Sequence, residues 1–224
     1  NHEKLKKIYE VFEKPMIKLL SKLEINGIKV DDAYLKKLSK KFEERLKKIE
    51  KEIYKVSGKE FNIGSPKQLG EIIYNDLKIA KLKKTKKGSL ATSAKILEDL
   101  ALTGNKFPNL VLEWRQVSKL KSTYTDALQE HINNKTKRVH TSFLLAATNT
   151  GRLASSDPNL QNIPIKTLDG KEIRKAFIAE KNNILISADY DQIEMRILAD
   201  MADVKELKKA FKNNQDIHTL TASQ

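Results

Sequence analysis

An α+β fold is predicted for this chain of 224 residues: a mainly helical N-terminal part, then an incomplete mixed part with a few antiparallel strands and helices. Apolar residues recur at the spacing of a helical face over residues 3–25, 32–56 and 108–132. Residues that start or stop helices flank these runs. Beyond residue 135 the apolar runs become short and alternate with turn-forming residues, which is typical of strands.

The first two helical runs have recognisable ends. Pro15 should interrupt the first run, because proline lacks the amide hydrogen that a helix uses, and Gly27 is a suitable stop. Asp31 or Asp32 can cap the second run, and Gly58 ends it. Since a short loop joins these two long helices, we expect them to pack as an antiparallel pair.

Two short helices and a basic loop are predicted between residues 58 and 104. Ser65 and Gln68 form a capping box, with proline at the first helical position, for a helix that reaches about residue 75. Residues 81–87 contain five lysines and are predicted to form a loop. The second short helix spans residues 93–102.

Three runs beyond residue 135 have the character of strands: 139–144, 177–179 and 184–188. The two asparagines at 182–183 predict a hairpin turn between the last two runs. Residues 148–165 are rich in turn formers and are predicted to be a loop. A helix follows over residues 192–201, and Asp216 is a candidate cap for a last one.

The composition favours a polyanionic partner. The net charge is +14, and most of the excess lies in residues 1–100, so neutralised phosphates would release counterions. The alternative is a solvated, lysine-rich surface. There is no cysteine, which excludes disulfides and thiolate metal sites, and no apolar run approaches the roughly 20 residues of a membrane span. Because it begins without Met inside a helical pattern, we expect the chain to be cut at both ends.

Asp189 is the first candidate for chemistry. The apolar run 184–188 predicts a buried strand, and a carboxylate at its end would be a rigid mount for a hard cation such as Mg²⁺. Two-metal phosphoryl transfer needs at least two carboxylates from different segments, and the sequence offers one convincing candidate. The alternative for Asp189 alone is a helix cap or turn residue.

Residues 148–162 carry side chains that suit nucleic acid. Arg152 can reach the minor-groove acceptors, which occupy similar places in every base pair. Asn159, Gln161 and Asn162 can add amide hydrogen bonds to bases and sugars. The alternative is a polar loop whose asparagines satisfy local turns.

Three strings, in order along nearly the whole chain, resemble motifs of family A DNA polymerases. They are Lys-Leu-Lys-Ser-Thr-Tyr-Thr-Asp at residues 119–126, Thr-Gly-Arg-Leu at 150–153 with Pro-Asn-Leu-Gln-Asn-Ile-Pro at 158–164, and Asp-Tyr-Asp-Gln-Ile-Glu-Met-Arg at 189–196. The family usually has Ser at the position of Asp191, which we expect to cap the following helix. The short string Asp-Ile-His at 216–218 resembles the start of the family's fingers.

The resemblance implies a role for each site residue. The catalytic residues would be Asp189, a metal ligand, and Glu194, the gate that excludes a ribose 2′-hydroxyl. Tyr190 would join Asp189 at the metals, and Arg196 would support the site. The residues that would bind the dNTP are Glu194, Gln192 and His218. Those that would bind DNA are Arg152, Asn159, Gln161, Asn162, Lys119, Lys121, Ser122, Thr123 and Tyr124, and Lys84 at the basic tip.

The resemblance also implies a domain organisation. Residues 1–134 would form a helical thumb with a basic tip at about 58–104, residues 135–212 a partial palm, and residues 213–224 the start of the fingers. In the intact enzyme, a primer 3′-hydroxyl would attack the α-phosphate of a dNTP with two Mg²⁺ ions. We expect this chain alone to be a monomer of the bacterial cytoplasm that binds primer–template duplex without polymerising.

Three alternatives remain open at this point. The first is a non-catalytic DNA-binding module derived from a polymerase. The second is a metal-dependent nuclease, which would need several more acids clustered in space. The third is a helical scaffold with incidental charge, which three ordered motif matches disfavour.

Overall fold

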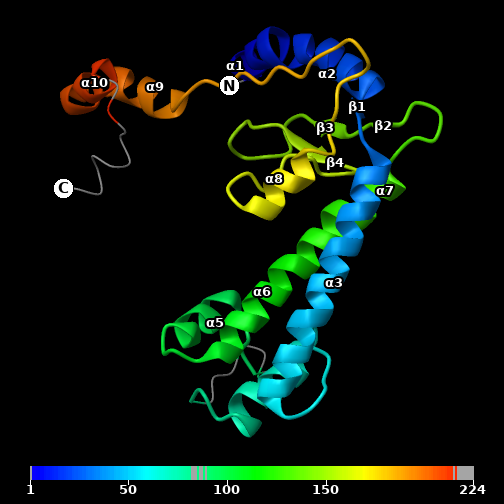
Figure 1. Ribbon diagram of the computed structural model, residues 1–224. Coiled ribbons are helices and arrows are strands. Elements are labelled where there is room, and N and C mark those ends of the chain that lie inside the picture. Colours follow the sequence, from blue (N-terminus) through cyan, green and yellow to red (C-terminus); the bar gives the residue numbers. More distant parts are fainter. Residues whose placement is uncertain (1, 82–84, 86–87, 89, 214, 216–224) are drawn as a thin grey trace. The chain divides into compact units, whose positions relative to one another are not determined.

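The computed structural model describes residues 2–81, 85, 88, 90–213 and 215. The chain forms two compact units, Asn1–Asn183 and Ile184–Gln224. Helices dominate, and the described strands form two short antiparallel two-stranded sheets (Figure 1). The predicted α+β class is therefore confirmed. Most of the basic loop 81–87, including Lys84, and residues 216–218 lie outside the described residues.

The first helical run is interrupted by a π-helical segment just before Pro15, close to the predicted position. It consists of α1 (His2–Ile8), a π-helical segment η1 (Tyr9–Glu13) and α2 (Lys14–Asn26). Pro15 lies in the first turn of α2, where a missing amide hydrogen costs little. Gly27 ends α2 with a positive φ of 57°.

The second helical run is α3 (Asp32–Ser57), and its predicted ends are confirmed. The side chain of Asp31 accepts a hydrogen bond from the amide of Tyr34 at 2.9 Å, so Asp31 is the cap. Gly58 ends the helix in the left-handed conformation, with a φ of 74°.

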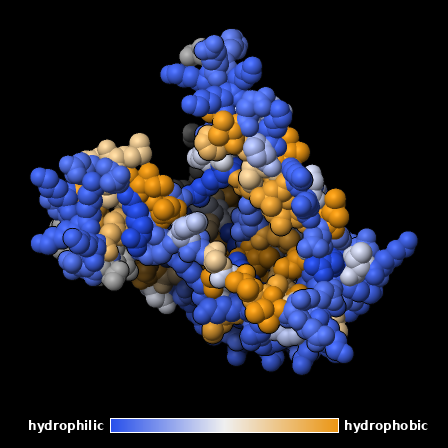
Figure 2. Space-filling view, turned by 90° about the horizontal axis from the view of Figure 1, so that it is seen from above, coloured by the Kyte–Doolittle hydropathy of each residue, from blue (hydrophilic) through white to orange (hydrophobic). Residues whose placement is uncertain are grey.

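The predicted antiparallel pairing of the first two helices is wrong. The partner of α3 is α6 (Lys106–Leu120), which runs beside it in Figure 1. An extended segment causes the difference: β1 (Ile28–Lys29) follows Gly27 and pairs with β2 (Arg138–Val139), so it redirects the chain between α2 and α3. Apolar side chains therefore remain exposed on the first helices, Phe12 among them. Hydrophobic residues are also visible at the surface on the face of the molecule that Figure 2 shows.

The far end of the α3–α6 pair carries the two predicted short helices. The first consists of α4 (Pro66–Glu71) and a π-helical segment η2 (Ile72–Asp76), with Ser65 as the cap. The second is α5 (Ala94–Ala101), which packs along α6. Their apolar side chains extend the core of the helix pair; among the buried ones are Leu69, Ile72, Ile73 and Leu97.

Helix α6 begins slightly before the predicted Pro108, because Asn105 caps it by accepting from the amide of Phe107 at 2.9 Å. It continues through a π-helical segment η3 (Lys121–Asp126) into α7 (Ala127–Glu130). The predicted end near residue 132 is thus confirmed.

Two strand predictions need correction in this unit. Residues 139–144 belong to two strands, because β2 pairs with β1 whereas β3 (Ser142–Leu144) pairs with β4 (Ala154–Ser156). Strand β4 lies inside the segment that was predicted to be loop. Its short polar sequence, Ala-Ser-Ser, has no apolar alternation, so its pairing comes from the tertiary structure.

Helix α8 (Leu168–Arg174) was not predicted from the sequence, and it joins the helix pair. Thr167 caps it by accepting from the amide of Gly170 at 3.1 Å. Arg45 of α3 bonds to Glu113 of α6 at 2.7 Å and to Asp169 of α8 at 2.8 Å. One guanidinium therefore links all three helices, and the hydrogen bond to Glu113 is the main cause that raises its pKa.

The predicted hairpin of residues 177–179 and 184–188 is wrong. Phe177 forms an isolated bridge with Val30, and the amide of Asn183 donates to the carbonyl of Glu180 at 2.9 Å, which closes a turn. Residues 184–188 are not a strand, and Ile186 is 82% exposed. The reason is that no segment of the described residues pairs with this run, and a strand needs a neighbour for its backbone groups.

The second unit contains α9 (Ile193–Met201), as predicted, and α10 (Lys205–Lys212). The predicted cap at Asp191 is wrong, because Gln192 holds the cap position with a φ of 50° and no side-chain cap bond. Asp191 instead pairs with Arg196 at 3.3 Å. In the described part of the chain, no helix is long and apolar enough to cross a membrane.

Gly27 provides a test of this fold. A Cβ there would lie 2.6 Å from the carbonyl oxygen of Val139, in a conformation that only glycine adopts readily. We expect Gly27→Ala to lower the free energy of unfolding by roughly 3 kcal/mol through strain and clash. Gly58→Ala is the matched control: its φ is also positive but nothing lies within 4 Å, so about 1 kcal/mol is expected. Equal losses in urea denaturation would contradict the close approach of β2.

Candidate nucleic-acid interface

Residues 158–164, here termed the amide loop, present amide side chains on one side. Asn159, Gln161 and Asn162 are exposed, whereas Ile163 is buried. The loop therefore inserts an apolar residue into the core and directs its amides to solvent. Such amides can donate to and accept from nucleic-acid bases and sugars.

The N-terminal half of the amide loop is held by two hydroxyl side chains. Thr141 donates to the carbonyl of Pro158 at 2.8 Å. The hydroxyl of Ser155, in β4, accepts from the amide of Leu160 at 3.0 Å. The strand that the sequence did not predict is thus part of the support for this loop.

The C-terminal half is held by a tyrosine and an arginine. Tyr124 of η3 donates its hydroxyl to the carbonyl of Asn162 at 2.5 Å. Arg174 of α8 donates to the carbonyls of Ile163 at 3.0 Å and Pro164 at 3.2 Å. Sequence reasoning gave Arg174 no role; the signal that could have found it is the helix that follows the Thr167 cap.

Asn159 also has a local role. Its side-chain oxygen accepts from the amide of Gln161 at 3.0 Å and from the hydroxyl of Ser155 at 3.3 Å. For Asn159, these bonds agree with the alternative interpretation of the sequence, in which asparagine side chains stabilise local turns. The side-chain oxygen of Asn159 is therefore engaged within the loop.

Arg152 lies in the exposed turn that precedes β4. Its carbonyl accepts from the hydroxyl of Thr148 at 2.9 Å, and Gly151 supplies a positive φ of 75° beside it. The turn therefore fixes the backbone at Arg152 while the residue remains exposed, as a contact to a ligand requires.

The segment 119–126 has an exposed and a buried face. Lys119, Ser122 and Thr123 are exposed. Lys121 is half-buried and pairs with Asp126 at 2.6 Å. Lysine and hydroxyl side chains on one exposed helical face are suited to phosphate contacts.

Tyr124 does not share this exposed face. It is only 6% exposed, and burial raises the pKa of its hydroxyl. This differs from the expectation that it faces a duplex. The signal that could have shown it is the apolar stripe Val117, Leu120, Tyr124 and Leu128, which has the spacing of a buried helical face.

Candidate residues of the second unit lie around the start of α9. Asp189, Tyr190 and Glu194 are exposed. Gln192 is half-buried, and its side-chain oxygen is buried without a hydrogen-bond partner. His218 lies outside the described residues.

The described residues do not fit a two-metal site. Among them, no group of three or more His, Cys, Asp or Glu side chains could hold a metal ion. Asp189 is an exposed carboxylate in a segment without secondary structure, not at the end of a buried strand as predicted. No catalytic step through a metal can therefore be assigned to these residues.

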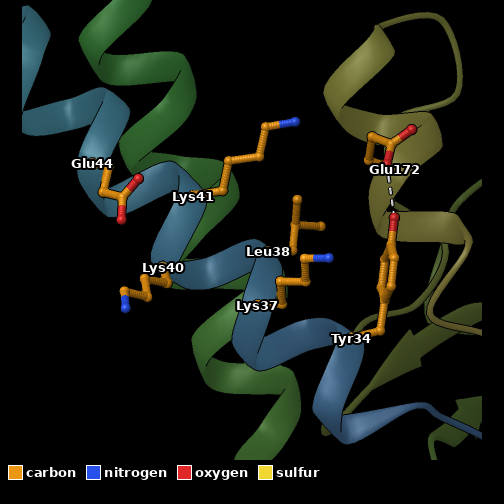
Figure 3. A pocket seen from close by; sticks show the side chains of 7 residues that line it. All are labelled: Tyr34, Lys37, Leu38, Lys40, Lys41, Glu44 and Glu172. Carbon is orange, nitrogen blue, oxygen red and sulfur yellow. Dashed lines mark hydrogen bonds between the residues drawn. The ribbon is translucent and has the colours of Figure 1, made fainter.

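A cleft of about 470 Å³ lies between α3 and α8. Its walls carry Lys37 and Lys41 on one side and Glu172 on the other, and Tyr34 donates to Glu172 at 2.7 Å (Figure 3). Burial and this hydrogen bond raise the pKa of Tyr34 to about 12. The cleft contains none of the site residues predicted from the sequence, and its tyrosine–carboxylate bond fastens α8 to α3.

Comparisons with known proteins agree on one family. Residues 32–224 match the family model described as DNA polymerase family A. DNA polymerase I of Rhizobium leguminosarum is 50% identical over 220 residues, which cover 98% of this chain and 22% of that protein. DNA polymerase I of Borreliella burgdorferi is 50% identical over 222 residues, which cover 99% of this chain and 24% of that protein. The chain thus spans about a quarter of the length of these relatives.

A solved structure has the same fold. It is the POL domain of Pol1 from M. smegmatis in complex with DNA primer-template and dNTP. The TM-score is 0.86 at 37% sequence identity, over 97% of this chain and 38% of that one.

The ion pair between Lys121 and Asp126 makes the free energy of unfolding depend on pH. Burial opposes ionisation of Asp126, but hydrogen bonds from Lys121 and Ser39 outweigh it and lower the pKa of the carboxyl. A lowered folded pKa gives stability that is present above the unfolded pKa and is lost as the pH falls through the folded pKa.

We therefore expect Asp126→Asn to lower the free energy of unfolding by about 1 kcal/mol at neutral pH, since the pair is partly solvent-screened. The difference from wild type should shrink below about pH 4. Asp76→Asn, which removes a surface pair with Lys59, is the control and should cost less. Urea denaturation at both pH values tests this, and a loss that does not change with pH would refute it.

Proposed function

The chain belongs to DNA polymerase family A and is a portion of its polymerase domain, and from this premise we propose that it binds primer–template DNA. The amide loop and the exposed face of residues 119–126 would form the binding surface. This surface lies entirely in the first unit.

One observation carries the proposal. The hydrogen bond from Tyr124 to the carbonyl of Asn162 joins two segments that are 38 residues apart in the chain. Thr123, beside Tyr124, and Asn162 are both exposed. Two candidate DNA-binding segments are therefore neighbours, so a single duplex can contact both.

The two segments suit different parts of a duplex. Lys119, Ser122 and Thr123 can contact phosphates, which position a duplex without reading its sequence. Arg152, Gln161 and Asn162 can donate to minor-groove acceptors, which are similarly placed in all base pairs. A polymerase needs such contacts because it must bind every sequence. The net charge of +14 favours the same polyanionic partner.

The catalytic assignments rest on the family membership. In a longer polypeptide, Asp189 and Tyr190 would be at the Mg²⁺ ions that family A polymerases use, and Glu194, Gln192 and His218 at the dNTP. The described residues supply no complete metal site, so we propose that the 224-residue chain binds DNA without polymerising. We also propose a location in the bacterial cytoplasm; the sources of the relatives support the bacterial part of this proposal.

A non-catalytic DNA-binding module is the second candidate. It is favoured by the same absence of a metal cluster among the described residues. Both candidates predict duplex binding, so activity in a longer polypeptide separates them.

Salt dependence of binding tests the proposal. The 224-residue chain should bind a primer–template duplex more tightly than single strand, with an affinity that falls as salt rises. Lys119→Ala should reduce the slope of log affinity against log salt by about 1, the value for one lost phosphate contact. Lys14→Ala removes an equal charge from α2, where Lys14 pairs with Glu10 of η1, and should leave the slope unchanged. Fluorescence anisotropy measures both, and equal slopes for the two variants would count against the surface.

Asp189 is tested in a polypeptide that carries the rest of the polymerase domain. Asp189→Ala should lower turnover at least ~1000-fold and leave primer–template affinity unchanged, because the surface in the first unit remains intact. Asp191→Ala, two residues away, should lower turnover less than ~10-fold. Wild-type turnover in Asp189→Ala would remove the catalytic assignment, and an inactive longer wild type would favour the non-catalytic module.

A further inference from the structure

Tyr124 and Arg174 support the amide loop from its buried side. We propose that they are positioning residues for DNA binding: they fix the loop backbone so that Gln161 and Asn162 project toward the duplex. This inference rests on the proposed function. Tyr124 belongs to the string at residues 119–126, which was expected to contact DNA, and Arg174 lies outside all the motifs.

Tyr124 is buried, so it does not contact DNA directly as the resemblance to the polymerase motif implied. Its ring belongs to the buried stripe between α3 and the amide loop, and it is only 6% exposed. The hydroxyl donates to the carbonyl of Asn162 at 2.5 Å. A buried hydroxyl that loses its acceptor pays the cost of desolvation, so this bond holds the loop in one place. Because burial raises the pKa of Tyr124, the hydroxyl remains a donor at neutral pH.

Arg174 holds the next two residues of the loop. Its guanidinium donates to the carbonyls of Ile163 and Pro164. Helix α8 can come this close because Gly170 has no side chain: a Cβ there would lie 2.5 Å from the carbonyl oxygen of Pro164. Arginine suits the task, since its planar fork can donate to two acceptors at once.

Three successive carbonyls, at 162, 163 and 164, are thus bound by side chains from η3 and α8. The loop belongs to no sheet, so no strand ladder fixes it. Side-chain donors therefore determine its conformation. A loop that is ordered before binding does not lose conformational entropy when DNA arrives, and this raises affinity without any added contact.

A double-mutant cycle tests the inference in the 224-residue chain. Tyr124→Phe removes only the hydroxyl and should weaken primer–template binding by about 3- to 10-fold. Asn162→Ala should also weaken binding. If Tyr124 acts by positioning Gln161 and Asn162, the two effects should be less than additive: Tyr124→Phe should weaken binding less in the Asn162→Ala variant than in wild type. The salt slope should not change, because no phosphate contact is lost.

Tyr74→Phe is the matched control. Tyr74 is also 6% exposed, and its hydroxyl donates to the carbonyl of Ala91 at 2.8 Å. Its removal should cost similar stability in thermal unfolding, and its effect on binding should add to that of Asn162→Ala. Arg174→Lys should weaken binding as Tyr124→Phe does, because a single ammonium cannot reproduce the fork.

The outcomes separate the two proposals. If the wild-type chain does not prefer primer–template over single strand, the proposed function fails. If wild type binds but Tyr124→Phe and Asn162→Ala are additive, only the positioning role is refuted. Full affinity in Tyr124→Phe, or in Asn162→Ala, refutes it equally. Coupling of Tyr74→Phe with Asn162→Ala would show that the effect is general destabilisation and would also overturn the inference.

Discussion

The apolar stripe of α3 must be covered by a second helix, and the orientation of the candidate binding residues in η3 depends on how α6 covers it. Phe42 and Ile53 of α3 are fully buried with Phe107 and Val117 of α6 in one core. Burial of side chains this large contributes roughly 1.5–3 kcal/mol each, so the packing fixes the rotation of α6 about its axis. That rotation in turn decides which side chains of the continuing segment η3 turn inward.

The packing of α6 on α3 therefore determines both which side chains of η3 are buried and which are exposed. Leu120 and Tyr124 continue the buried stripe, which leaves Lys119, Ser122 and Thr123 on the exposed side. The π-helical geometry of η3 belongs to the same segment, and π-turns are frequent at functional sites. The amide loop then packs on the inward face through Ile163 and the Tyr124 hydroxyl. The packing of α6 on α3 therefore determines the position of the amide loop and of the proposed binding surface.

Local signals in the sequence predicted most helices of the first unit, α8 excepted, because a cap or a stop acts within a few residues. Ser65 and Gly58 were identified from sequence and have the expected conformation, and Asp31 is the cap among the two residues that the sequence offered. Long-range pairing was not predictable in the same way. Strand β4 forms because β3 lies beside it, and the apolar run 184–188 has no such neighbour among the described residues. The motifs showed which segments matter, but the direction of Tyr124 depends on the packing of α6, and the role of Arg174 depends on contacts between α8 and the loop.

Three arginines of the first unit have a structural task that differs from the one proposed for the exposed Lys119. Arg45 bridges three helices, Arg138 donates to the carbonyls of Asn26 and Gly27, and Arg174 holds the amide loop. These side chains organise the protein, because a planar guanidinium can satisfy several fixed acceptors. Lysine is a strongly hydrated point charge on a flexible stem, which suits phosphates at varied positions.

Salt should act on these two groups differently. Phosphate contacts weaken as counterions accumulate, whereas hydrogen bonds from Tyr124 and Arg174 to uncharged carbonyls have no counterions to release. The amide loop should therefore keep its conformation at salt concentrations that release the duplex. Affinity would then respond to salt through the exposed lysines, while the geometry of the amides proposed to face the base pairs remains set by the packing of α3, α6 and α8.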